Sequence, residues 1–367
     1  RLIMKKISLL IILPSLAGGG AEKVTISFIE NLNPKFFDYK LIVINGIGPL
    51  KININKQRIT NLNGNRFRNS FIEIIKKIKS LKPDIILSTF PHITLPLLLA
   101  KNIFFPKVLI IAREPNMVSP SLSNSSLPII LKFFYKVLMP SANRVIVNSK
   151  AMYDDLSQRK ININKLTLIH NPVDHINIRK VNNFYRYPGR GLRLVAMGRL
   201  VYQKGFDRII PILKEVNNVH LTILGEGPDY SKLLKMTHNH FVKNKINFQG
   251  YVDDANAYIA AADYFILPSR WEGLPNAALE SLALGTPVIS FEEVVGLLDI
   301  VNNSKPNSIY LCKNIDEMKK ILKELPVRKD LNNISLRNNL LKNFNTPLEY
   351  CEKLSDIMKE TFNEREH

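Results

Sequence analysis

Two glutamates in the second half of the chain, Glu272 and Glu280, have a spacing that lets both act on one ligand. Glu272 lies in a turn-rich segment after the apolar run 264–267, and Glu280 lies about one turn inside the helix predicted to begin near Ala277. The unpaired N–H groups of that helix start suit an anion such as a diphosphate. Glutamates that merely offset a helix dipole have the same spacing, so both interpretations stay open at this point.

Cations and glycines follow other apolar runs. Arg199 and Lys204 come just after 192–197. A guanidinium fork suits two phosphate oxygens and a lysine adds a mobile point charge, although both side chains can equally be solvated loop charges. Gly18-Gly19-Gly20 follow the run 7–13. They permit either a tight turn or the close approach of a ligand to the backbone.

The elements that must position these residues alternate between short apolar runs and longer amphipathic stretches. Fully apolar strands that alternate with helices predict parallel sheets covered on both faces. The strand candidates are 7–13, 39–44, 85–89, 108–112, 144–148, 192–197, 219–224, 246–249, 264–267 and 287–290, and the clearest helix candidates are 21–32, 67–80, 206–215, 230–243 and 275–284.

The polar stretch 182–191 has no apolar periodicity and divides this pattern into two halves. We therefore expect an α/β protein with two doubly wound, Rossmann-like domains, 1–182 and 190–345, that face each other across a cleft. Ligands of such sheets bind outside the carboxyl ends of the strands. An amphipathic helix at about 346–367 can pack back on the first domain or on the second.

The charge is uneven along the chain. Residues 1–180 hold 27 Lys and Arg against 9 Asp and Glu, a balance of +18, whereas the remainder holds 24 against 22, a balance of +2. This asymmetry predicts an anionic partner for the first half, such as phospholipid, a phosphorylated acceptor or nucleic acid. A basic, Asn- and Ile-rich composition is the alternative, but it does not explain why acids are scarce there. No stacking-aromatic or helix-turn-helix pattern accompanies the charge, which argues against nucleic acid.

The amino-acid composition further narrows the class of protein to which this chain can belong. The hydrophobic and charged fractions, 46% and 22%, are typical of a soluble globular protein, and Cys312 and Cys351 suit reduced thiols in the cytoplasm. The start, Met4–Leu13, has some features of a secretory signal, but we favour a buried first strand because the helical pattern continues after it. No later run reaches the roughly 18 apolar residues of a membrane span, so any membrane contact is expected at the surface.

The segment from Pro268 to Ile289 resembles the E-x7-E signature of retaining glycosyltransferase family 4, which has the GT-B fold. Its Glu-Gly-Leu-Pro-Asn, Leu-Glu and Gly-Thr-Pro-Val-Ile strings all match that pattern. Further segments are similar to the same family in the expected order along nearly the whole chain, and these are 14–22, 171–174, 195–200, 203–207, 224–228 and 248–252.

The resemblance implies a donor site. It assigns Arg199 and Lys204 to the donor diphosphate, Glu272 to the hydroxyls of the donor sugar, and Glu280 to the ribose. It also places the N–H groups of Asn276 and Ala277 on the donor, Gly250 in the segment beside the base, and Gly19 and Gly20 in a loop that closes on the donor phosphate. The two carboxylates are thus expected to bind the donor rather than to act as acid and nucleophile.

The sequence departs from the family in two places. Many relatives carry a histidine after the strand 108–112, where this chain has Arg113 and Glu114, with His92 nearby in sequence. Arg113 and Glu114 either form a structural ion pair or contact a substrate, and with Glu272 they are the catalytic candidates. Relatives commonly have glycines and an acidic residue where the next helix opens, whereas the segment 295–301 has the single glycine Gly296, which leaves the details of donor binding open. No Asp-x-Asp motif is present and the histidines show no metal spacing, so no metal or other cofactor is expected.

The function expected from this resemblance is transfer of a hexose, with retained configuration, from a nucleotide sugar, which we expect to be UDP-linked. The acceptor is expected to be a saccharide or lipid-linked saccharide of cell-surface polysaccharide assembly, such as lipopolysaccharide. The basic stretch 66–82 points to a peripheral site on the inner face of the cell membrane. A related GT-B epimerase or phosphorylase and a non-catalytic sugar-nucleotide binder are the alternatives. The sugar, the acceptor and the linkage are not encoded in any motif.

Overall fold

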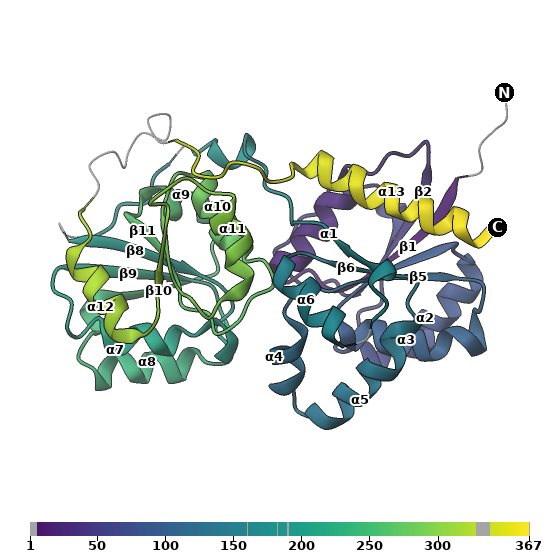
Figure 1. The fold of residues 1–367 in the computed structure, drawn as a ribbon, viewed down its shortest axis with the longest axis horizontal. Helices are drawn as coiled ribbons and strands as arrows, with labels where there is room; N and C mark the ends of the chain where they lie inside the picture. Colours follow the sequence, from purple (N-terminus) through teal and green to yellow (C-terminus); the bar gives the residue numbers. More distant parts are fainter. Residues whose placement is uncertain (1–5, 160, 182, 189–190, 328–337, 367) are drawn as a thin grey trace. The chain divides into compact units, whose positions relative to one another are not determined.

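The computed structural model describes residues 6–159, 161–181, 183–188, 191–327 and 338–366. The chain divides into two compact units, Arg1–Pro172 with Asn345–His367, and Val173–Phe344. Each unit is a parallel β-sheet with helices packed against it (Figure 1). This confirms the predicted α/β class with two doubly wound sheets.

The first unit has seven parallel strands in the order β3-β2-β1-β4-β5-β6-β7. The winding direction reverses beside β1, because β1 pairs with both β2 and β4. Ligands of doubly wound sheets bind at such a switch point. The strands are β1 (Ile7–Ser15), β2 (Phe37–Asn45), β3 (Ile59–Asn61), β4 (Ile85–Thr89), β5 (Leu109–Arg113), β6 (Arg144–Val147) and β7 (Leu166–Leu168).

The C-terminal helix α13 (Pro347–Glu366) belongs to this first unit. Tyr350, Leu354 and Met358 lie in the same buried core as the side chains of β1 and α1, as Figure 1 also shows for the helix. The other helices of the unit are α1 (Gly20–Glu30), α2 (Phe67–Leu81), α3 (Pro91–Phe104), α4 (Val118–Ser123), α5 (Pro128–Leu138) and α6 (Lys150–Gln158).

The second unit repeats the plan with six parallel strands in the order β10-β9-β8-β11-β12-β13. The switch point lies between β8 and β11. The strands are β8 (Leu192–Met197), β9 (Val219–Leu224), β10 (Ile246–Gly250), β11 (Tyr264–Leu267), β12 (Val288–Phe291) and β13 (Ile309–Cys312), and the helices are α7 (Phe206–Ile212), α8 (Tyr230–Asn239), α9 (Ala255–Ala261), α10 (Asn276–Ala283), α11 (Leu298–Asn302) and α12 (Ile315–Glu324).

Two predicted helices are shorter in the structure, for local reasons. The stretch 230–243 ends as a helix at Asn239, and Phe241 takes a left-handed φ of 55°. The stretch 206–215 ends at Ile212, one residue after Pro211, which cannot donate a helical hydrogen bond. Neither change moves a predicted site residue, because both helices leave the sheet edge at which those residues lie.

Candidate functional site

Three neighbouring strands of the second unit, β8, β9 and β10, each reach a glycine at their carboxyl ends. The amide of Gly198 donates to Leu224 O (3.0 Å), and the amide of Gly225 donates to Gly250 O (2.7 Å). Gly225 has a φ of +126°, and a Cβ there would lie 2.2 Å from Gly198 O, so no other residue fits. Because these glycines have no side chains, the backbones of the three strand ends pack closely together. The loops that carry the predicted donor-binding residues lie beside them.

Glu272 is nearly buried, with 6% of its surface exposed, and three side chains bond its carboxylate, of which Gln203 Nε2 donates to Oε2 at 3.5 Å. Lys204 Nζ lies 2.6 Å from Oε1, and the Ser269 hydroxyl donates to the same oxygen at 2.7 Å. A charged carboxylate in the interior needs such partners. The structure thus brings together two predicted residues from separate loops, which follow β8 and β11, and adds Ser269, which the sequence analysis did not single out.

The loop that carries Lys204 is fixed to the loop that carries Glu272 by a second ion pair. The Arg270 guanidinium bonds both carboxylate oxygens of Asp207, at 2.9 and 2.7 Å, and lies 3.9 Å from the centre of the Tyr202 ring. Burial alone raises the pKa of Asp207, but the hydrogen bonds and charge of Arg270 outweigh it and lower that pKa. Gln203 adds a bond from its amide to Trp271 O (2.9 Å). These contacts hold Lys204 in place against Glu272.

Arg199 differs from Lys204, because its side chain is exposed and no residue in the described part of the chain pairs with it. It stands one residue beyond Gly198, at the carboxyl end of β8. A guanidinium in this position is accessible to an anion from solution. It makes no side-chain hydrogen bond or ion pair with a described residue that would stabilise the fold.

Helix α10 begins at Asn276, directly after the loop that holds Glu272. Asn276, Ala277 and Glu280 are all half-buried. The segment 295–297 packs behind this loop, since a Cβ on Gly296 would lie 1.8 Å from Gly273 O. Although the segment lacks the usual glycines of the family, its single glycine therefore fits tightly against the loop of Glu272.

In the first unit, the predicted glycine loop connects β1 to α1. Gly18 has a φ of +82°, and Gly19 is the residue before the helix, accepting from the amide of Lys23 at 3.0 Å. A Cβ on Gly19 would lie 2.5 Å from a carboxylate oxygen of the buried Glu22. Gly20 opens the helix. The lack of a side chain at Gly19 thus leaves room for the carboxylate of Glu22. The assignment of Gly19 and Gly20 to donor binding stays a prediction.

Arg113 and Glu114 are both buried, but they do not form the ion pair that was one of the two alternatives. Arg113 instead donates to the Tyr350 hydroxyl (3.0 Å), to Asn171 Oδ1 (3.0 Å) and to Ala21 O (3.3 Å). It therefore links β5 to α1 and α13. Glu114 accepts from the Tyr135 hydroxyl at 3.2 Å. A catalytic role for either residue stays a prediction.

The carboxyl group of Glu114 has a strongly raised pKa. Burial raises its pKa to about 8, against the opposing effect of the Tyr135 hydrogen bond, and the nearby charge of Asp155 adds to the increase. At neutral pH most of this carboxyl group is protonated. Tyr135, which no sequence pattern singled out, is its only side-chain hydrogen-bond partner among the described residues.

Two further polar atoms at the carboxyl edge of the first sheet have no partner among the described residues. They are Thr89 Oγ1, at the end of β4, and Asn148 Oδ1, just after β6. Both side chains are at least 97% buried and flank the end of β5. Unpartnered buried polar atoms are costly, so these atoms are candidates for contact with a ligand.

The described residues contain no group of three or more His, Cys, Asp and Glu side chains that could hold a metal ion. Within the same residues, no helix is long and apolar enough to cross a membrane.

Comparison with known proteins agrees with this architecture. Residues 18–176 match the model of "Glycosyltransferase Family 4", and residues 179–341 match that of "Glycosyl transferases group 1". The lipopolysaccharide core biosynthesis glycosyltransferase LpsE of Rhizobium meliloti is 38% identical over 97 residues, which span 26% of this chain but only 28% of LpsE.

Two relatives match over most of their length. An N-acetylgalactosamine-N,N'-diacetylbacillosaminyl-diphospho-undecaprenol 4-alpha-N-acetylgalactosaminyltransferase of Campylobacter jejuni is 25% identical over 85% of this chain and 88% of its own. The crystal structure of Anabaena HepE in complex with UDP and glucose superimposes with a TM-score of 0.73 at 15% identity, covering 96% of this chain and all of HepE. The chain is therefore a GT-B glycosyltransferase of family 4.

Proposed function

We propose that this chain transfers a hexose from a nucleotide diphosphate sugar, UDP-linked, to a saccharide or lipid-linked saccharide, with retained anomeric configuration. The observation that carries the proposal is the buried carboxylate of Glu272, held by Lys204 and Ser269 at the glycine-rich carboxyl edge of the second sheet. HepE, which has the same fold, was solved with UDP and glucose.

Cleavage of a nucleotide-sugar bond leaves a diphosphate that needs positive charge. Arg199 is exposed and unpaired within the described residues, so its planar fork is available for two phosphate oxygens. Lys204 has three N–H donors, of which Glu272 takes one. In our proposal Lys204 bridges Glu272 and the diphosphate, and the N–H groups of Asn276 and Ala277 at the start of α10 add neutral donors.

The two glutamates receive different roles in this proposal. Glu272 is fixed by its partners and is nearly buried, so it can hold sugar hydroxyls in one orientation while the bond breaks. Glu280 is half-buried within α10 and binds the ribose hydroxyls. Gly250 leaves the backbone open beside the base. The charges of Arg199 and Lys204 replace those of a metal ion, so we propose transfer without a metal cofactor.

The acceptor is assigned to the first unit. The unpartnered atoms of Thr89 and Asn148 lie at the edge of its sheet where ligands of this fold class bind. The Campylobacter relative is named for a diphospho-undecaprenol acceptor. Together with the +18 balance of residues 1–180, this supports an anionic, lipid-linked saccharide at the inner face of a membrane, as in polysaccharide assembly.

A screen of thermal shifts against nucleotide sugars tests the donor. We expect one UDP sugar to stabilise the wild type, and Glu280→Ala to abolish this stabilisation while the protein stays folded. Glu324→Ala, a change on an exposed acid at the end of α12, serves as the control. If no nucleotide sugar stabilises the protein, or if Glu280→Ala leaves the shift unchanged, the donor site is wrongly placed.

The stabilising donor is then incubated with lipid-linked and free saccharides, and the product is examined by mass spectrometry and by NMR of the anomeric proton. A product with the donor's configuration supports the proposal. Donor conversion without any acceptor indicates an epimerase, cleavage that needs free phosphate indicates a phosphorylase, and binding without turnover indicates a non-catalytic protein.

A further inference from the structure

Helix α5 has an unusual environment for an apolar helix. Its sequence, Pro128–Leu138, contains two lysines and is otherwise hydrophobic, yet Tyr135 is its only buried residue. Ile129 is 83% exposed, Phe133 61% and Val137 55%. We call the exposed apolar side chains of this helix and its first flanking residue the α5 surface, and they are Leu127, Ile129, Ile130, Phe133, Phe134 and Val137.

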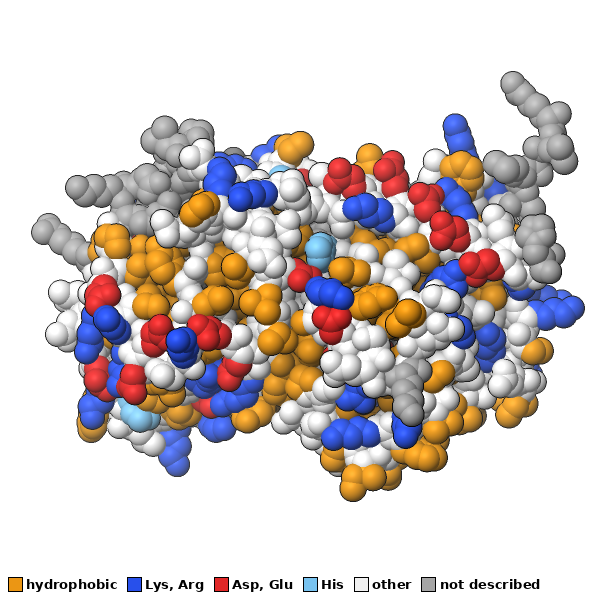
Figure 2. Space-filling model, in the orientation of Figure 1, with side chains coloured by type: hydrophobic (Ala, Val, Ile, Leu, Met, Phe, Trp, Pro, Cys, Tyr) orange, Lys and Arg blue, Asp and Glu red, His pale blue; other side chains and the backbone are white. Residues whose placement is uncertain are grey.

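Figure 2 shows apolar side chains gathered on the same part of the first unit where Figure 1 places α5. The neighbouring helix α3, which packs against α5, also exposes Leu99 and Ile103. Exposed apolar clusters of this kind mark an interaction site in soluble proteins.

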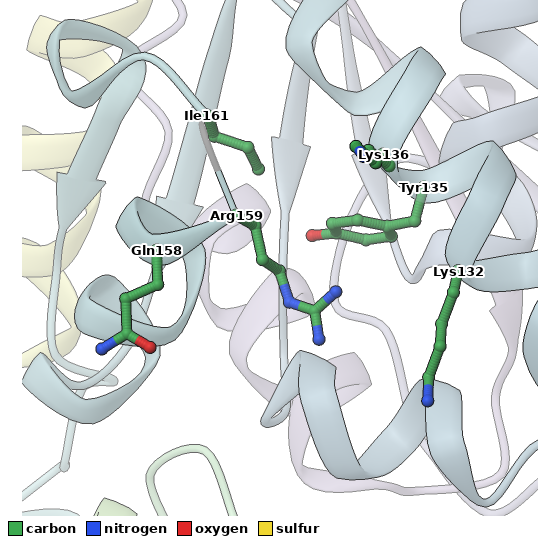
Figure 3. A pocket seen from close by; sticks show the side chains of 6 residues that line it. All are labelled: Lys132, Tyr135, Lys136, Gln158, Arg159 and Ile161. Carbon is green, nitrogen blue, oxygen red and sulfur yellow. The ribbon is translucent and has the colours of Figure 1, made fainter.

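A hollow of about 270 Å³ lies between α5 and the end of α6, lined by Lys132, Tyr135, Lys136, Gln158, Arg159 and Ile161. Figure 3 shows Lys132 and Tyr135 reaching into this region from α5, and Arg159 from the facing segment, with the Tyr135 hydroxyl directed toward Arg159. Among the described residues, three cationic side chains and no acidic one line the hollow.

Among the described acids near the hollow, Asp155 offsets one of these three charges, that of Arg159. Asp155 is paired with Arg159 at 3.4 Å and also accepts from the amide of Ser119 at 2.9 Å. Glu114 lies behind Tyr135 and is mostly protonated at neutral pH, because burial raises its pKa to about 8. Lys132 and Lys136 are exposed and have no partner among the described residues. Their positive charge remains available to an anion.

We propose that α5 is the membrane-docking element of this chain, with the α5 surface inserted among the acyl chains of an anionic bilayer and the hollow occupied by a lipid phosphate group. The two lysines stand four residues apart on the helix that carries the apolar side chains. This combination of apolar residues and lysines is what an interfacial helix needs. This inference rests on the proposed function, in which the acceptor is a lipid-linked saccharide at a membrane, and it adds the element that contacts that membrane.

Charge complementarity favours a lipid over a second copy of the chain. In a twofold symmetric dimer through α5, Lys132 and Lys136 would face the same lysines of the other copy. An anionic headgroup layer neutralises them instead, and it also matches the +18 balance of residues 1–180.

The proposal relocates the membrane contact predicted from the sequence. The stretch 66–82 forms α2, which does expose Lys76 and Lys79, but its apolar face is buried through Phe67, Ile74 and Ile78. Helix α2 therefore offers charge with two exposed apolar side chains, Ile72 and Leu81, whereas α5 offers charge with five.

Co-sedimentation with vesicles tests the proposal, using phosphatidylcholine alone or with a third of phosphatidylglycerol. We expect the wild type to bind the anionic vesicles, and Ile129→Asp with Phe133→Asp to reduce the bound fraction at least tenfold. Phe241→Asp, at an 88% exposed phenylalanine of the second unit, is the matched control and should bind like the wild type. Equal binding of the α5 double variant and the wild type would overturn the proposal.

The lysines are tested in the same way. Lys132→Ala with Lys136→Ala should weaken binding to anionic vesicles more than Lys76→Ala with Lys79→Ala does, and the reverse order would place the contact on α2. Competition by 10 mM inorganic phosphate at constant ionic strength would assign the hollow to a free anion rather than a lipid. Light scattering that shows a dimer dispersed by the aspartate pair would assign the α5 surface to a second copy.

Donor binding separates this inference from the proposed function. The α5 variants should keep the thermal shift with the stabilising nucleotide sugar. Vesicle binding without any nucleotide-sugar shift would refute the donor site and leave the docking inference standing. A retained nucleotide-sugar shift with no vesicle binding by the wild type would refute the docking inference alone.

Discussion

Lys204 Nζ lies 2.6 Å from Glu272 Oε1, and the two residues come from loops that follow different strands of one sheet. The ion pair is largely shielded, since the Glu272 side chain is 8% exposed and that of Lys204 is 24% exposed. The ion pair therefore joins Glu272, which we propose orients the donor sugar, to Lys204, which we propose binds the donor diphosphate.

Lys204→Ala should destabilise the second unit as well as abolish turnover. Removal of the ammonium leaves Glu272 buried without a cation, which we expect to cost about 2 kcal/mol, less than for a fully buried pair because Lys204 is partly exposed. Glu272→Gln in the same background should restore much of the stability but not the activity. Urea unfolding of the single and double variants measures both effects. Equal stability of Lys204→Ala and the wild type would contradict the coupling.

Arg199→Ala should behave in the opposite way. Arg199 is exposed and its guanidinium makes no hydrogen bond or ion pair within the described residues, so the free energy of unfolding should change by less than about 0.5 kcal/mol. Loss of a charge-assisted hydrogen bond should weaken UDP binding by about 10- to 100-fold, as measured by calorimetry. Arg199→Lys should recover part of the affinity. UDP binding unaffected by the alanine would remove Arg199 from the donor site.

Gly225→Ala and Gly250→Ala should differ in their effect on stability. Both glycines have positive φ, but an alanine Cβ at position 225 would lie 2.2 Å from Gly198 O, whereas at position 250 its nearest contact is Glu226 Oε1 at 3.5 Å. We expect Gly250→Ala to cost about 1 kcal/mol and Gly225→Ala at least about 2 kcal/mol more. Thermal unfolding compares the two, and similar losses would argue against the close approach of the two strand ends.

The fold was predictable because buried parallel strands carry a strong local signal. The runs that became β1 up to Leu13, β4 and β11 are mainly apolar, with Ser8, Ser88 and Thr89 as the exceptions, and glycines or turn residues follow their ends. The candidate residues follow such ends, which places them at one edge of the sheet before any contact is known. The pairing of Lys204 with Glu272 was not predictable, because 68 positions separate them and no pattern couples them.

Helix α5 was missed for a different physical reason. Only two of its residues, Lys132 and Lys136, are polar, so the run lacks the broad polar face from which the predicted helices were identified. The position of α13 was equally hidden, because an amphipathic pattern shows that a helix buries one face but not which unit covers it. The bond from Arg113 to the Tyr350 hydroxyl, which spans 237 positions, supplies that information.

Stability should fall as the pH rises from about 4.5 toward 8, through the carboxyl group of Glu114. Its pKa is about 8 in the folded protein and 4.5 as a model value, so the folded state binds more protons between these limits. The contribution is complete below pH 4.5 and is lost above 8, and the shift corresponds to about 5 kcal/mol. Glu114→Gln, which keeps an acceptor for Tyr135, should flatten this dependence. A pH profile of unfolding identical in wild type and variant would show that Glu114 is charged in the folded protein.

The role of Arg113 can be decided with Tyr350→Phe, which removes one acceptor from the guanidinium but keeps its charge. If Arg113 acts by joining β5 to α13, this change should cost about 1 kcal/mol, because a buried donor loses its partner, while kcat stays near the wild-type value. If Arg113 acts on a substrate, reorientation of the guanidinium should lower kcat by more than the loss of stability explains. Asn345→Ala is the matched control. Asn345 lies two residues before α13 and donates to His170 O, so its loss weakens the packing of α13 on the first unit without removing a partner of Arg113. A fall in kcat for Tyr350→Phe but not for Asn345→Ala would assign Arg113 to the reaction.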